Sequence, residues 1–211
     1  MHRLFASSDQ LASARYRSGA EIFGEGDPAE HIYQVASGAV RTHKLLSDDR
    51  RQIGAFYLPG DIFGLENVAT HRFTAEAITS TTVRLARRKC LDDVVKSDPS
   101  VLGIILAETT RNLVHVENHL LLLGRKNSLE KVAAFLFEMH LRSTEAGVIH
   151  LPMTRRDIAD YLGLALETVS RAFADLRRKN ILGFDVKRAR TVVVLDAKAL
   201  TDLAEYHPPT S

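Results

Sequence analysis

The sequence predicts an α+β protein in which short strands come first, one long helix follows, and two short helices lie near the C-terminus. Three observations support this prediction. Residues 18–90 contain strand-like runs between turn-forming residues, residues 98–124 carry a heptad repeat, and residues 154–178 contain two amphipathic helical patterns around a glycine. A chain of 211 residues can form one large domain or two small ones. We expect boundaries that divide it into residues 1–97, 98–124 and 125–211.

The N-terminal part contains five short runs with strand character. They comprise residues 20–23, 31–36, 39–45, 52–58 and 82–86, and glycine, proline and aspartate separate them, as at residues 24–28 and 59–61. Short strands at regular spacing with such turns between them indicate an antiparallel barrel or sandwich.

The long helix is expected to begin after Asp98, a good N-cap, and to end at Gly124. Ile104, Ile105 and Leu122 lie off its heptad seam, so the helix has apolar surface for its own barrel and for a twin helix. We therefore expect a homodimer, with packing of the seam on its own barrel as the alternative. The seam alternates spacings of four and three: Leu102, Leu106, Thr109, Leu113, Val116, Leu120 and Leu123.

A helix at residues 128–141 and an extended piece at 147–151 precede the two short helices, and a strand-like run at 186–195 follows them. Thr154 and Asp157 form a capping box at the start of the first short helix. Gly163 makes the turn, and Ala165 begins the second helix without a side chain that can cap it. Two short helices around a glycine turn are typical of a helix-turn-helix.

The charge is concentrated in this region. Residues 151–190 hold nine basic and five acidic residues, a net charge of +4, whereas residues 1–125 are neutral. Glu167, Ser170 and Arg171 share the face of the second helix opposite Val169 and Phe173, so they are expected to be exposed. Arginine can bond guanine O6 and N7 together, and glutamate suits cytosine N4, so the face suits base reading in DNA. The alternative is an ordinary Glu167–Arg171 ion pair on a solvated surface.

The predicted DNA-binding residues therefore form two groups. Glu167, Thr168, Ser170 and Arg171 lie on the second helix, and the flanking basic side chains are Arg155, Arg156, Arg177, Lys187 and Arg188.

Other functions are not expected. Cys90 is the single cysteine, which excludes a four-cysteine iron–sulfur site within one chain. His115 and His119 stand four residues apart but lack a third ligand, so we expect a solvated helix face, no metal and no cofactor. No catalytic constellation points to an enzyme, no apolar run reaches the ~18 residues of a membrane span, and the N-terminus lacks a secretory signal. We expect a cytoplasmic protein.

Several motifs give the chain a resemblance to a known family. Residues 24–28, 33–41 and 59–64 resemble the β-roll of Crp/Fnr transcription regulators, and residues 156–163 and 167–171 resemble the helix-turn-helix of that family. The resemblance implies an N-terminal β-roll (a jelly roll like that of cyclic-nucleotide-binding domains), a long dimerisation helix and a C-terminal winged helix-turn-helix. It also implies a transcription activator that binds double-stranded DNA as a homodimer and contacts RNA polymerase.

The Glu-Thr-Val-Ser-Arg run at residues 167–171 is most similar to the FixK-like branch, which reads DNA as Fnr does but lacks its iron–sulfur cysteines. This branch implies a role in nitrogen fixation and a palindrome similar to TTGAT-N4-ATCAA. Arg171 would read the guanine, Glu167 the cytosine region of the opposite strand, and Ser170 a thymine.

The cyclic-nucleotide signature departs from the family pattern. Glu66 is displaced by one residue, and Phe73 follows Arg72 where the phosphate clamp needs a small hydroxyl residue. We therefore expect no nucleotide in the roll. Two alternatives stay open: a regulator gated by another ligand in the roll, and one gated by oxidation of Cys90, which lies beside three basic residues.

Overall fold

The computed structural model describes residues 11–65, 68–90, 95–96, 98–124, 127–185, 188 and 190–204. Its contacts divide the chain into two compact units, Met1–Val116 and Glu117–Ser211. The boundary falls within the long helix rather than at either of its ends. The threefold division expected from the sequence remains a prediction.

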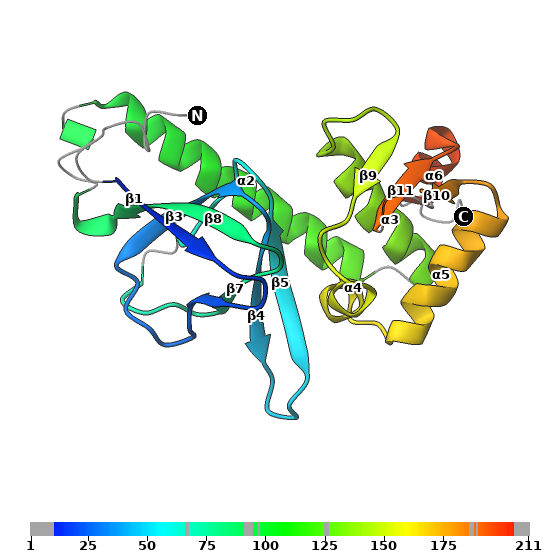
Figure 1. The fold of residues 1–211 in the computed structure, drawn as a ribbon, viewed down its shortest axis with the longest axis horizontal. Helices are drawn as coiled ribbons and strands as arrows, with labels where there is room; N and C mark the ends of the chain where they lie inside the picture. The colour runs from blue at the N-terminus through cyan, green and yellow to red at the C-terminus, as the bar shows by residue number, and fades with distance from the viewer. Residues whose placement is uncertain are drawn as a thin grey trace, which may run out of the picture. The chain divides into compact units, whose positions relative to one another are not determined.

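The first unit contains two four-stranded antiparallel sheets (Figure 1). This arrangement confirms the predicted β-roll. In the first sheet the strand order is β1 (Leu11–Tyr16), β8 (Thr81–Arg87), β3 (His31–Ser37) and β6 (Ile62–Phe63). In the second it is β2 (Glu21–Phe23), β7 (Thr74–Ala77), β4 (Val40–Leu45) and β5 (Arg51–Tyr57). A short 3₁₀ helix, η1 (Arg88–Cys90), follows β8.

The five runs predicted from the sequence correspond to β2, β3, β4, β5 and β8. The other three strands of the roll, β1, β6 and β7, were not predicted. Strand β6 has only two residues, too few for a pattern. Strand β7 reads Thr-Ala-Glu-Ala, and both alanines are buried. Alanine has little strand preference, so only the pairing of β7 with β2 and β4 makes it a strand.

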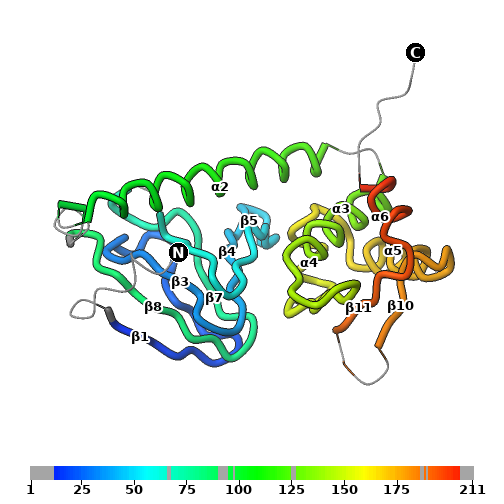
Figure 2. The backbone as a smooth tube through the Cα atoms, turned by 90° about the horizontal axis from the view of Figure 1, so that it is seen from above, coloured from blue at the N-terminus to red at the C-terminus, as the bar shows by residue number. Residues whose placement is uncertain are grey.

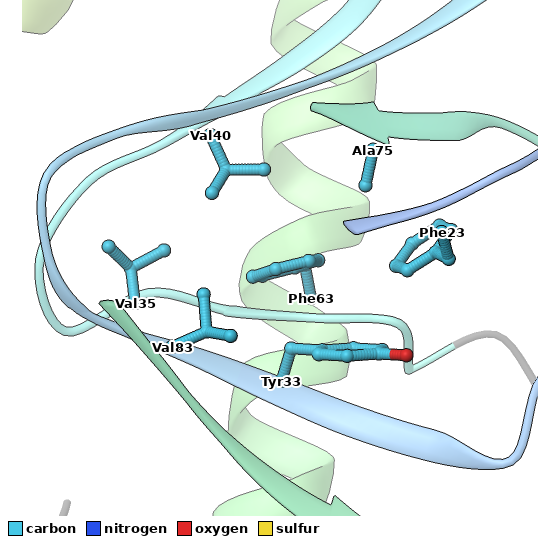
Figure 3. Close-up of a cluster of buried hydrophobic side chains, with 7 residues drawn as sticks. All are labelled: Phe23, Tyr33, Val35, Val40, Phe63, Ala75 and Val83. Atoms are coloured by element: carbon cyan, nitrogen blue, oxygen red, sulfur yellow. The ribbon is translucent and has the colours of Figure 1, made fainter. Parts of the chain in front are cut away.

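The interior of the roll is filled by side chains from both sheets (Figure 3). The ring of Tyr33 lies 5.2 Å from that of Phe23 and 5.1 Å from that of Phe63 between centroids. His71 stacks on Phe23 at 3.5 Å. Aromatic rings in such contact stabilise a core beyond the area that they bury. The aliphatic members of the cluster are Val35, Val40, Ala75 and Val83.

Gly38 forms the tight turn between β3 and β4. Its φ of +86° is unfavourable for other residues, and a Cβ at this position would lie 2.5 Å from the carbonyl oxygen of Ser80. The buried hydroxyl of Thr81 donates to the carbonyl of Ala39 at 3.0 Å and so fixes the turn from the other side.

Helix α2 (Ser100–Leu123) begins as predicted, because a carboxylate oxygen of Asp98 accepts the backbone N–H of Ser100 at 3.0 Å. Its N-terminal part runs beside the strands of the roll (Figure 2). There Val101 is buried against Ile32 and Ile62. The helix ends at Leu123, immediately before Gly124.

The second unit contains four more helices and a three-stranded antiparallel sheet. The helices are α3 (Ser128–Leu141), α4 (Arg155–Leu162), α5 (Leu166–Arg178) and α6 (Ala197–Ala204). The sheet has the order β10 (Leu182–Phe184), β11 (Thr191–Val194), β9 (Val148–His150). Helices α4 and α5 followed by the β10–β11 hairpin form the predicted winged helix-turn-helix; β10 and α6 were not predicted. The core of the second unit includes Phe135 and Leu136 of α3, Ile158 and Leu162 of α4, and Val169 and Leu176 of α5.

Candidate DNA-binding site

Local hydrogen bonds position helix α4. The hydroxyl of Thr154 accepts the backbone N–H of Asp157 at 3.1 Å, and the carboxylate of Asp157 accepts the backbone N–H of Thr154 at 2.9 Å. This confirms the predicted capping box. Gly163, with a φ of +63°, ends the helix in the left-handed conformation and turns the chain toward α5.

Helix α5 separates a buried face from an exposed one. Val169 and Phe173 are buried, as predicted, whereas Glu167, Ser170 and Arg171 are exposed. Thr168 is half-buried at the edge of the exposed face. Ala165 occupies the N-cap position of α5 and makes no side-chain hydrogen bond there, which confirms that the helix lacks a side-chain cap.

The charged side chains of the exposed face do not neutralise each other. The Nε of Arg171 donates to the backbone carbonyl of Glu167 at 3.4 Å, and the Ser170 hydroxyl donates to the carbonyl of Leu166 at 2.9 Å. Among the described residues, no ion pair joins Arg171 to the carboxylate of Glu167. The guanidinium and the carboxylate therefore both face solvent at their outer ends.

The flanking basic residues have different surroundings. Arg156 and Arg177 are exposed. The guanidinium of Arg188 is exposed and lies 3.8 Å from the carboxylate of Glu145. Lys187 lies outside the described residues.

Arg155 differs from its neighbour Arg156 because it is half-buried. Its guanidinium carbon lies 3.0 Å from the centroid of the Phe173 ring and 5.8 Å from that of Phe184. Burial lowers the pKa of Arg155 to about 10, so the side chain is still charged at neutral pH. The sequence places Arg155 among the basic side chains that flank the motif, and its DNA-binding role stays a prediction. Phe184 comes from β10, which was not predicted.

The heptad seam of α2 points away from the chain's own core. Leu102, Leu106, Leu113, Val116 and Leu120 are between 51% and 65% exposed. Thr109 is exposed too, and Leu123 is half-buried. Five large apolar side chains on one stripe of one helix are therefore accessible to a partner, and the alternative that the seam packs on its own barrel is wrong for them.

The opposite face of α2 is covered by the chain itself. Glu108 and Leu122 are buried, and the ring of His119 stacks on that of Tyr161 at 4.1 Å. The prediction that His115 and His119 lie on a solvated face is wrong, because both are half-buried. Within the described residues, no three metal-ligating side chains gather in one place.

The expectation that the roll binds no cyclic nucleotide stays a prediction. Aromatic rings occupy the interior, as Figure 3 shows, and Arg72 is exposed at the surface instead of lying within the roll. A phosphate needs an arginine fork beside free backbone N–H groups. Glu66 and the side chain of Cys90 lie outside the described residues.

In the part of the chain that the structure describes, no helix is long and apolar enough to cross a membrane.

Comparisons with known proteins agree with both halves of the fold. Residues 13–98 match the family model of the cyclic nucleotide-binding domain, and residues 130–203 match that of the Crp-like helix-turn-helix domain. The nitrogen fixation regulation protein FixK of Rhizobium meliloti is 40% identical over 190 residues, which cover 90% of this chain and 86% of FixK. The transcriptional activatory protein AadR of Rhodopseudomonas palustris is 38% identical over 194 residues, 90% of this chain and 80% of AadR.

A solved structure is similar throughout. The structure of FixK2 from Bradyrhizobium japonicum has a TM-score of 0.87 and 51% sequence identity, and the match covers 94% of this chain and 99% of that one. The match to FixK2 therefore spans the β-roll, the long helix and the helix-turn-helix of this chain. The relatives are regulators rather than enzymes, and the chain belongs with them to the Crp/Fnr family of DNA-binding transcription regulators, as a FixK-like member.

Proposed function

We propose that this protein is a homodimeric, cytoplasmic transcription activator that reads a palindrome similar to TTGAT-N4-ATCAA. The observation that carries the proposal is the exposed face of α5, where Glu167, Ser170 and Arg171 present an acceptor, a hydroxyl and a bidentate donor on adjacent turns. These groups suit the edges of bases in the major groove.

Each side chain of this face has a proposed partner. The guanidinium of Arg171 donates two hydrogen bonds to O6 and N7 of a guanine. The carboxylate of Glu167, which can only accept, takes a hydrogen bond from N4 of cytosine on the opposite strand. Ser170 contacts a thymine, with Thr168 beside it. Arg156, Arg177, Lys187 and Arg188 hold the backbone phosphates, which fixes the position of α5 without reading sequence.

The palindrome requires two copies of α5, and the seam of α2 supplies the contact between them. Leu102, Leu106, Leu113, Val116 and Leu120 are each more than half exposed. Two copies of this stripe, related by a twofold axis, would cover each other as in a coiled coil with Thr109 at one polar position. A twofold dimer places its two recognition helices about 34 Å apart, one turn of DNA.

The names of the relatives support the proposed activation and biological role. FixK is named for nitrogen fixation regulation and AadR as an activatory protein. We propose the same class of role here, with RNA polymerase as the partner of the DNA-bound dimer. Because Glu66 and Phe73 depart from the cyclic-nucleotide signature, DNA binding is expected without an added cyclic nucleotide.

One gel-shift experiment tests the proposal. The purified protein should bind a TTGAT-N4-ATCAA duplex as a dimer and discriminate against a duplex in which both guanine·cytosine pairs are exchanged for adenine·thymine pairs. Equal binding to the two duplexes would refute the palindrome. Transcription from a promoter with this site, using purified RNA polymerase, should rise on addition of the protein; an unchanged or reduced yield would refute activation.

A further inference from the structure

We infer that Arg155 is a positioning residue, which fixes the β10–β11 wing against helix α5 by stacking on Phe173 and contacting Phe184 beside it. Its neighbour Arg156 is exposed and stays a candidate phosphate contact. The inference rests on the proposed function only in that α5 and the wing both face DNA.

The three side chains come from three elements. Arg155 is the first residue of α4, Phe173 belongs to α5, and Phe184 is the last residue of β10. The guanidinium of Arg155 lies over the face of Phe173, 3.0 Å from its centroid, and 5.8 Å from the centroid of Phe184. The two rings are 6.4 Å apart. A planar guanidinium over a ring face is an attractive cation–π arrangement, and it strengthens where water is excluded, as at this half-buried site.

Phe184 is a notable partner because it is 36% exposed. A large ring at the edge of a sheet would ordinarily be expendable. Phe184 lies at the point where the chain leaves β10 for the turn of the wing. Its ring contacts the guanidinium groups of Arg155 and of Arg177, whose guanidinium carbon lies 5.9 Å from the ring centroid. The ring thus connects the turn end of β10 to the first residue of α4 and to the last turn of α5.

The other arm of the wing is tied to the same place. Arg190, next to the first residue of β11, donates from its guanidinium to the carbonyl of Pro152 at 2.9 Å. Its own carbonyl accepts the N–H of Leu151 at 3.0 Å. Arg190 adopts a φ of +67°, which is unfavourable for a side chain of this kind, so its contacts hold a strained conformation. Both arms are therefore fixed at the segment that leads into α4.

This double attachment has a consequence for DNA recognition. Arg188 lies in the sequence between the two attached points, so the clamp sets where its charge stands relative to the reading face of α5. A wing that is already in place loses less freedom on binding DNA than a loose one. Removal of the clamp should weaken binding to every duplex without removing a phosphate contact.

The test compares Arg155 with its matched neighbour. Operator affinity is measured against salt concentration for Arg155→Met, Arg155→Lys and the control Arg156→Met. The clamp predicts that both Arg155 variants bind two- to thirtyfold more weakly, the range that a contact of ~0.5–2 kcal/mol allows. Lysine keeps the charge but not the planar stacking group. Both variants should retain the wild-type salt slope, whereas Arg156→Met lowers that slope by about one unit.

Two results would overturn the inference. If Arg155→Met lowers the salt slope as Arg156→Met does while Arg155→Lys binds normally, Arg155 is a phosphate contact. If both Arg155 variants bind with wild-type affinity, the stack has no positioning role.

A second measurement needs no DNA, so failure of the proposed function and failure of this inference are distinguishable. In the NMR spectrum of the free protein, the Arg155 side-chain protons over the Phe173 ring should be shifted upfield, and Phe184→Leu should alter that shift and broaden the wing signals. Unshifted Arg155 protons would contradict the stack. A double variant provides a third test if the wild-type protein binds the operator. Arg155→Met combined with Phe184→Leu should lose no more affinity than the single variant that binds the operator less tightly. If the two losses multiply instead, the two side chains act independently.

Discussion

Replacement of Leu113 by aspartate should dissociate the dimer while leaving each chain folded. Leu113 lies in the middle of the α2 seam and is 57% exposed, so the side chain contributes little to the core of its own chain. In a twofold dimer, two copies of residue 113 lie near the axis. The variant therefore places two carboxylates in the surface that the proposed dimer buries.

The cost can be worked out from this geometry. Covering the exposed part of a leucine contributes about 1–2 kcal/mol, since complete burial is worth ~1.5–3 kcal/mol. The dimer loses two such contributions. Desolvation of a carboxylate costs several kcal/mol per ion in addition. The total is on the order of 10 kcal/mol, which raises the dissociation constant of the dimer by about seven decades.

Sedimentation velocity and a gel shift with the palindrome measure the two consequences. Leu113→Asp should sediment as a monomer, keep the far-ultraviolet circular dichroism of the wild type and lose operator binding. Asn118→Asp is the matched control, because it adds the same charge to an exposed position of α2 off the seam. A Leu113→Asp protein that remains a dimer would refute the assignment of the seam, and another surface would then hold the dimer together.

Three further perturbations test the site and the fold. Arg171→Ala should lose ~1–3 kcal/mol of operator binding and most of its discrimination at one guanine position; unchanged discrimination in competition assays would exclude base reading by Arg171. Ala165→Ser supplies the missing N-cap of α5 and should raise the free energy of unfolding by ~0.5–1 kcal/mol in urea titrations, with no gain if the hydroxyl cannot reach the helix. Gly38→Ala places a Cβ 2.5 Å from the carbonyl of Ser80 and should cost about 2–4 kcal/mol. Gly26→Ala, with a φ of +91° but open space, should cost only about 1 kcal/mol, and equal melting temperatures for the two variants would show that the contact at Gly38 relaxes freely.

Local sequence signals predicted the recognition elements well. The Thr154–Asp157 capping box and the turn at Gly163 both fix a boundary through contacts within four residues, and both were found as predicted. Because the apolar spacing of α5 defines its buried face, the exposed positions of Glu167 and Arg171 followed as well. Such features need no knowledge of the rest of the chain.

Contacts between distant residues could not be predicted in this way. The position of Arg155 depends on Phe184, which belongs to a strand of three residues with no pattern of its own. The half-buried state of His119 depends on Tyr161, which lies in another helix. A sequence pattern shows that a face is polar or apolar, but a stacked arginine or histidine has the same pattern as a solvated one.

The contact between His119 and Tyr161 also bears on where the DNA-binding part of the chain can be separated from the rest. The last turns of α2, from Glu117 onward, share a compact unit with the helix-turn-helix, and Leu122 is buried there. A fragment that starts at residue 125 would expose the ring of Tyr161 and the surface that Leu122 covers, whereas one that starts at residue 117 would retain both contacts. The same two turns carry Leu120 and Leu123 of the seam. A DNA-binding fragment that starts at residue 117 would therefore include part of the proposed dimer interface.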